Sequence, residues 1–165
     1  MLSIREVILP LTARTPKGQT VHAWDYKQKK NLVIAFLHSG CRGCEAFLGK
    51  LAARAAELAE HEAVALVIFS EPPPARVSEN LPPQVIVAAD VIGESHCKYL
   101  GDDAFGPAGL ERVGVFVADR YGELYKQWVA RTEDGLPAIG ELLAWLGQIQ
   151  VACEECGIPH WPVDL

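Results

Sequence analysis

Two cysteines separated by two residues form the part of this sequence best suited to chemistry. Cys41 and Cys44 lie in the segment Cys41-Arg42-Gly43-Cys44, between an apolar run at residues 32–37 and a helical pattern over residues 47–59. Residues three apart in a helix share one side of it, so the two sulfurs can close a small disulfide loop. The free N–H groups and positive dipole end of a helix favour a thiolate over a thiol, and Arg42 adds a cation. The motif therefore predicts a dithiol that cycles with its disulfide.

The roles of the two sulfurs stay open at this stage. Cys41 can attack a partner while Cys44 resolves the mixed disulfide, or the roles can be reversed, because both arrangements place a second sulfur beside the first. A pair of buried, unreactive thiols is the alternative without function. His38, three residues before Cys41, could relay a proton or bind a metal ion, although a hydrogen-bonded structural histidine is the commoner role. Cys97 is read as a small buried apolar residue, with a resolving cysteine as the alternative.

A second Cys-x-x-Cys pair follows near the C-terminus. Cys153 and Cys156 are followed four residues later by His160. These three side chains are zinc ligands by type, but a structural zinc site takes four, and no fourth is visible nearby. A second redox pair that exchanges electrons with the first, and a passive terminal staple, are the other two interpretations. The sequence leaves the three open.

Hydrophobic patterning predicts the elements that position these residues. Three continuous apolar runs predict strands buried on both faces, and a helix between the first two makes a right-handed βαβ unit. These runs are residues 32–37, 63–69 and 85–88. The other predicted elements are two N-terminal strands around a turn at 15–18, a short helix, a strand pair joined by a hairpin turn, and a final amphipathic helix. They are residues 4–9, 20–24, 94–100, 113–118, 124–129 and 136–149.

This order of elements resembles the thioredoxin fold, and more closely the redoxin branch that includes the peroxiredoxins, the alkyl hydroperoxide reductase/thiol-specific antioxidant family. The segments that carry the resemblance are residues 25–37, the Cys41–Cys44 motif, residues 87–90 with 99–101, and residues 115–123. The resemblance implies an α/β chain with a central mixed sheet flanked by helices and an N-terminal β-hairpin extension. It also implies an enzyme in which Cys41, Cys44 and Arg42 are catalytic and no cofactor is needed.

Several positions depart from the patterns of the families it resembles. Val113 stands where thioredoxins carry a cis-proline, and Ala35 where they carry a buried carboxylate. If Cys44 occupies the peroxidatic position, Cys41 replaces the peroxiredoxin threonine and Val113 its arginine. Arg112 and Arg42 are then the nearby candidates for the missing cation.

Three hypotheses follow. The first is a redoxin-type thiol–disulfide oxidoreductase with a thiol or disulfide as electron donor or acceptor. The second is a thiol-dependent peroxidase with Cys44 as the peroxidatic sulfur and a hydroperoxide as substrate. The third is a metal-binding redoxin-like protein that uses His38 and the cysteine pairs.

Composition bounds these hypotheses. The chain has 165 residues, half of them hydrophobic, which predicts one domain over residues 1–165 with a cysteine-bearing tail at about 151–165. A net charge of −6 argues against nucleic acid and anionic membrane as partners. Residues 1–11 lack the pattern of a signal peptide, and no apolar run approaches the roughly 20 residues of a membrane span. Five cysteines without a secretory signal predict a reducing compartment, so the expected location is cytoplasmic, while the oligomeric state stays open.

Overall fold

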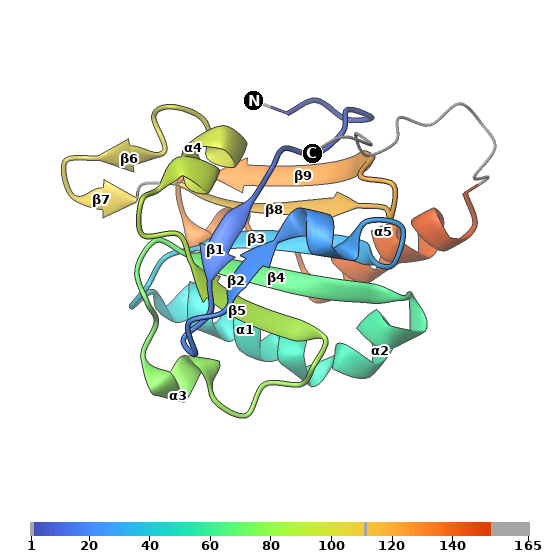
Figure 1. The fold of residues 1–165 in the computed structure, drawn as a ribbon, viewed down its shortest axis with the longest axis horizontal. Coiled ribbons are helices and arrows are strands. Elements are labelled where there is room, and N and C mark those ends of the chain that lie inside the picture. The colour runs from blue at the N-terminus through green and yellow to red at the C-terminus, as the bar shows by residue number, and fades with distance from the viewer. Residues whose placement is uncertain (1, 111, 153–165) are drawn as a thin grey trace.

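The computed structural model describes residues 2–110 and 112–152 and shows a mixed α/β architecture (Figure 1). Its strands are β1 (Thr12–Arg14), β2 (Thr20–His22), β3 (Asn31–Leu37), β4 (Ala63–Phe69), β5 (Val85–Ala89), β6 (Phe105–Gly106), β7 (Gly109–Leu110), β8 (Val113–Ala118) and β9 (Leu124–Ala130). Its α-helices are α1 (Arg42–Ala53), α2 (Ala55–Glu60), α3 (Ala75–Ser78), α4 (Glu94–Leu100) and α5 (Ile139–Gln150), and its short 3-10 helices are η1 (Ala23–Tyr26) and η2 (Glu133–Gly135).

Seven of the strands form one sheet in the order β2-β1-β5-β4-β3-β8-β9, and β6 and β7 make a separate hairpin. Strands β3, β4 and β5 are parallel, and Leu37, Phe69 and Ala89 stand in one row at their carboxyl ends. Strand β8 runs antiparallel to β3, and its Gly114 pairs with Phe36. The loops after β3, β4 and β5 therefore leave the sheet at the same edge as the start of β8.

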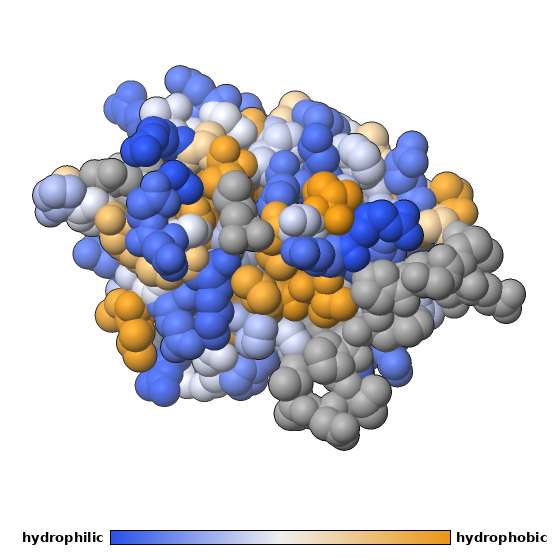
Figure 2. Space-filling model, turned by 90° about the horizontal axis from the view of Figure 1, so that it is seen from above, coloured by the Kyte–Doolittle hydropathy of each residue, from blue (hydrophilic) through white to orange (hydrophobic). Residues whose placement is uncertain are grey.

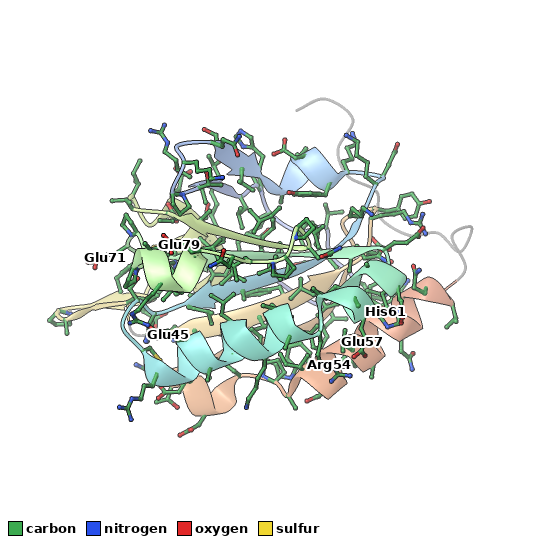
Figure 3. All side chains as sticks on the ribbon, turned by 90° about the horizontal axis from the view of Figure 1, so that it is seen from below. Glu45, Arg54, Glu57, His61, Glu71 and Glu79 are labelled. Atoms are coloured by element: carbon green, nitrogen blue, oxygen red, sulfur yellow. The ribbon has the colours of Figure 1, made fainter. Side chains whose placement is uncertain are left out.

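Strand β3 is the centre of the core, because every one of its residues is buried. Its side chains alternate between two apolar clusters, as the pleat of a strand requires. Val33, Ala35 and Leu37 pack in the cluster formed with α1 and α5, which lie on one side of the sheet (Figure 3). Residues at the alternate positions pack with α4 and the N-terminal segment. Burial on both faces explains the continuous apolar run that predicted this strand.

The helical pattern of residues 47–59 is divided between two helices in the structure. Helix α1 ends at Ala53, α2 begins at Ala55, and Arg54 between them has a φ of −111° and a ψ of 26°. The Arg54 guanidinium donates two hydrogen bonds to the Glu57 carboxylate, at 2.8 and 2.7 Å (Figure 3). Leu51 of α1 and Ala55 of α2 are nevertheless both buried, so the predicted apolar face continues across the break.

One predicted strand is wrong. Residues 4–9 form no strand and make only an isolated bridge between Val7 and Glu123, and the partner of β2 is β1 instead. Arg5 has a φ of +73°, which takes the backbone out of extended geometry, while the Arg5 N–H donates to the Leu124 carbonyl at 2.7 Å. This segment is therefore held as an irregular cover beside β9. The N-terminal hairpin is confirmed, with its turn at residues 15–18.

Surface features bear on two further expectations. Figure 2 shows one face of the molecule, on which polar side chains are interspersed with smaller apolar patches. Among the described residues, no helix has the length and apolar character needed to span a bilayer.

Cys153, Cys156 and His160 lie outside the described residues, so the three interpretations of the C-terminal pair remain predictions.

Candidate redox site at the start of α1

Cys41 is the N-cap residue of α1. Gly40, with a φ of +73°, turns the chain out of the sheet, and Cys41 itself is extended, with a φ of −93° and a ψ of 121°. The Cys41 carbonyl accepts the first hydrogen bond of the helix from the Glu45 N–H at 3.0 Å. Its Sγ accepts the otherwise free N–H of Cys44 at 3.2 Å, and the side chain is half-buried. The N-cap position therefore places the Cys41 sulfur at the N-terminus of α1, in contact with a backbone N–H.

Cys44 has a different environment, although it is only one helical turn away. Its side chain is fully buried and belongs to the core cluster between the sheet, α1 and α5. Burial raises the pKa of Cys44 to about 12, and the hydrogen bond with the Cys41 side chain and the charges of Cys41 and Glu133 act in the same direction. A backbone hydrogen bond from His38 only partly opposes them. Cys44 therefore stays protonated at neutral pH, and both cysteines are free thiols in this structure.

His38 lies where β3 ends, and it completes a cluster with the two cysteines. One ring nitrogen of His38 and the sulfurs of Cys41 and Cys44 all lie within 4.8 Å of one another. The Nε2 atom of His38 is buried and has no hydrogen-bond partner among the described residues. The predicted structural role through hydrogen bonding therefore does not account for this atom. A buried, unpartnered imidazole nitrogen can accept a proton or bind a metal ion.

Glu133 is the residue of this site that the sequence did not reveal. A Cβ added to Gly43 would lie 2.2 Å from Cγ and 2.8 Å from Cβ of Glu133, so the aliphatic part of Glu133 lies directly over the first turn of α1. Only glycine at this position of the motif leaves room for that contact. Glu133 comes from η2, far along the chain, and nothing in the local pattern around it indicates the contact. Its carboxylate adds a negative charge near Cys44.

Arg42 and Arg112 are the two cations that the sequence offers for this site. Arg42 is exposed, and the charges that act on the pKa of Cys44 are those of Cys41 and Glu133, so the stabilising role of Arg42 remains a prediction. The Arg112 guanidinium donates to the Leu100 carbonyl at 2.9 Å and pairs with Asp103. Arg112 is therefore engaged by α4 and the loop after it.

The loops that follow β3, β4 and β5 lie at the same end of the sheet as the two cysteines. The Ser39 hydroxyl donates to the Glu71 carbonyl at 3.0 Å, which ties the loop after β3 to the loop after β4. Val91 and Ile92, which follow β5 at the same edge, are 70% and 91% exposed. On the other side, a groove of about 670 Å³ runs between α1 and the start of α5, and Gly43 and Glu133 contribute to its lining. Cys41 is the half-exposed member of the pair at this end of the sheet, and Cys44 is buried.

Comparison with known proteins identifies the architecture. Solved structures match over most of the chain. One, from Chlorobium tepidum and assigned as a thiol:disulfide interchange protein DsbE, matches with a TM-score of 0.65 and 18% identity, over 89% of this chain and all of that one. The chain has a thioredoxin-like fold. AhpC from Mycobacterium tuberculosis matches with a TM-score of 0.70 and 17% identity, over 95% of this chain and 97% of that one.

The peroxidoxin BcpB from the same organism matches this thioredoxin-like chain with a TM-score of 0.72 and 18% identity, over 87% and 96% of the two chains. No protein-family model and no curated protein sequence matches. The expected fold, a central mixed sheet flanked by helices with an N-terminal hairpin, is confirmed.

Proposed function

We propose that this chain is a redoxin-type thiol–disulfide oxidoreductase in which Cys41 attacks and Cys44 resolves. The observation that carries the proposal is the unequal placement of the two sulfurs. Cys41 is half-buried at the helix N-cap and accepts a backbone N–H, whereas Cys44 is fully buried and protonated. As the resemblance to redoxins implies, the partner is a thiol or a disulfide, and it docks at the carboxyl ends of the parallel strands.

The reaction has two steps. The Cys41 thiolate attacks a disulfide of the partner, forming a mixed disulfide and releasing one partner thiolate. The Cys44 sulfur then attacks Cys41 Sγ, which forms the Cys41–Cys44 disulfide and releases the second partner thiolate. Two electrons pass from the dithiol to the partner, and the reverse sequence oxidises a partner dithiol.

The second step needs a base, because the pKa of Cys44 is raised to about 12. His38 fits this role, since one of its ring nitrogens lies within 4.8 Å of the Cys44 sulfur. The imidazole takes the Cys44 proton as the sulfur attacks and returns it to the departing partner thiolate. Glu133, on the other side of the α1 first turn, disfavours an unneutralised Cys44 thiolate and so makes coupled proton transfer more important.

The same geometry argues against Cys44 as a peroxidatic sulfur. A peroxidatic cysteine must be an accessible thiolate when the peroxide arrives. Cys44 is neither accessible nor ionised at neutral pH. The structural likeness to AhpC and BcpB therefore does not carry over to peroxide reduction through this residue.

The proposal is tested by trapping the mixed disulfide. In a variant with Cys97, Cys153 and Cys156 replaced by serine, Cys44→Ser should accumulate a mixed disulfide with a small disulfide substrate, on Cys41. The Cys41→Ser variant should form one at least tenfold more slowly, because Cys44 is both shielded and protonated. Mass mapping after acid quenching measures both.

Retention of both free thiols after exposure of the otherwise unmodified protein to the same disulfide would refute the redox couple. Faster trapping on Cys44 than on Cys41 would refute the assignment of roles. A parallel assay with hydrogen peroxide and a thiol donor tests the peroxidase alternative, for which we expect a rate no higher than that of free cysteine.

A further inference from the structure

The cluster of His38, Cys41 and Cys44 is also a set of metal ligands. Their three donor atoms lie within 4.8 Å of one another. The cluster follows the carboxyl end of β3, where the Cys41 side chain is half-exposed. An independent observation points to a ligand here. The Nε2 atom of His38 is shielded from water yet has no hydrogen-bond partner among the residues described, which leaves its desolvation uncompensated.

The chemistry of the donors selects the metal. One imidazole and two thiolates are the ligands that zinc takes in three-ligand sites, where a water or substrate fills the fourth position. Zinc–sulfur and zinc–nitrogen bonds of about 2.3 and 2.0 Å place tetrahedral ligand atoms roughly 3.5–3.8 Å apart. The three atoms therefore need to approach by about 1 Å from their largest present separation.

The net charge of the metal–ligand complex distinguishes Zn²⁺ from Cu⁺, the other metal ion that binds thiolates well. Zn²⁺ with two thiolates and a neutral imidazole has no net charge, whereas Cu⁺ with the same ligands carries one negative charge. Cys44 is fully buried, and the Glu133 carboxylate acts on it from across the first turn of α1. A buried site beside a carboxylate disfavours an uncompensated negative charge. The neutral zinc complex is therefore the better match.

We propose that the reduced protein binds one Zn²⁺ through His38, Cys41 and Cys44, and that bound zinc withdraws the dithiol from disulfide exchange. Binding exchanges two S–H bonds for two zinc–sulfur bonds and releases two protons to solvent, with no change in oxidation state. The disulfide form has no thiolates to offer, so zinc binding and oxidation exclude each other. The binding itself is independent of the proposed function, and only its effect on exchange rests on it.

Metal titration of the full chain tests the site. The protein carries serine at positions 97, 153 and 156, so that only two thiols remain, and it is reduced and freed of metal before use. Competition with a chromophoric chelator should give one zinc per chain, and Co²⁺ in its place should show thiolate-to-cobalt charge-transfer absorption. Cys44→Ser and the oxidised protein should lose this site.

The His38→Gln variant gives the decisive comparison. Loss of a direct ligand should lower zinc affinity by at least roughly tenfold, since even the loss of a group that only orients a ligand costs that much. His22→Gln is the matched control, because His22 is exposed on the N-terminal hairpin and its Nδ1 hydrogen-bonds to Thr12 Oγ1. It should bind zinc like the parent protein.

Absence of zinc binding, or equal affinity in the His38→Gln variant and its parent, would overturn the proposed site. Neither outcome touches the oxidoreductase proposal, which is measured separately as disulfide formation in metal-free protein. If zinc binds as expected but metal-free protein forms no disulfide, the site stands and its control of exchange is refuted.

Discussion

Replacing Cys41 by serine leaves Cys44 as the remaining thiol of the motif, so the effect of burial on its reactivity can be measured. Burial is the largest cause that raises the pKa of Cys44 from 9.0 to about 12, and it remains in this variant. The value of about 12 is the upper limit in this variant, because the hydrogen bond and charge of Cys41 are lost, and at that limit the thiolate population of Cys44 well below pH 9 is about a thousandfold lower than that of a cysteine with the ordinary pKa of 9.0. The less acidic thiolate is the better nucleophile by roughly 20- to 30-fold, since nucleophilicity rises with about 0.4–0.5 of the pKa difference. Ionisation alone therefore slows alkylation of Cys44 by up to about 30- to 60-fold, and shielding of the sulfur slows it further.

The assay is the rate of iodoacetamide modification between pH 6 and 10, with Cys97, Cys153 and Cys156 replaced by serine. The Cys44 rate in the folded Cys41→Ser variant should lie well below that of the same variant in denaturant. It should still rise about tenfold per pH unit at pH 10, because the thiol is far from half-ionised there. The Cys44→Ser variant, which leaves Cys41, should be modified faster at every pH.

Circular dichroism over the same pH range is the control for the folding of the Cys41→Ser variant. A Cys44 rate that levels off below pH 9, or that equals the rate in denaturant, would contradict the expected suppression of Cys44 ionisation by burial. It would mean that Cys44 ionises as readily as an exposed cysteine, and the assignment of Cys41 as the attacking sulfur would lose its basis.

Further predictions concern stability and are measured by chemical denaturation. Gly114→Ala should destabilise the protein by about 1–3 kcal/mol, because its Cβ would lie 2.5 Å from a methyl carbon of α4. Gly49→Ala, on the exposed side of α1 with nothing within 4 Å, should instead stabilise it by about 0.5–1 kcal/mol, and equal effects would contradict the packing argument. Burial alone would raise the pKa of Asp90, but its hydrogen bonds with His96 outweigh this and lower it. The stability that this carboxylate provides is therefore present above its unfolded pKa of about 3.9 and is lost as the pH falls below that value. The Asp90→Asn variant should therefore lose less of its free energy of unfolding over this acidic range. The raised pKa of Cys44 has the opposite sign, so stability should fall as the pH rises above 9. Cys44→Ala should reduce this loss, and an unchanged alkaline slope would contradict it.

Local residue patterns predict the strands and helices that hold the two cysteines. The run at residues 32–37 is apolar at every position, which is typical of a short strand covered on both faces. The glycine and cysteines that follow are typical of a turn and a helix start, and they predict that Cys41 and Cys44 lie at the beginning of α1, where the structure has them. These inferences succeed because strand burial and helix capping depend on residues close together in the chain.

The difference between the two sulfurs depends on contacts that form only in the folded chain. Cys41 and Cys44 are equivalent in the motif, and both orders of attack satisfied the sequence. Their difference arises from the burial of Cys44 between the sheet and α5, and from the carboxylate of Glu133 over Gly43. The unpartnered nitrogen of His38 is likewise a property of the packed site. Burial and charge act through space, between segments distant in the chain, and no local pattern records which segments will meet.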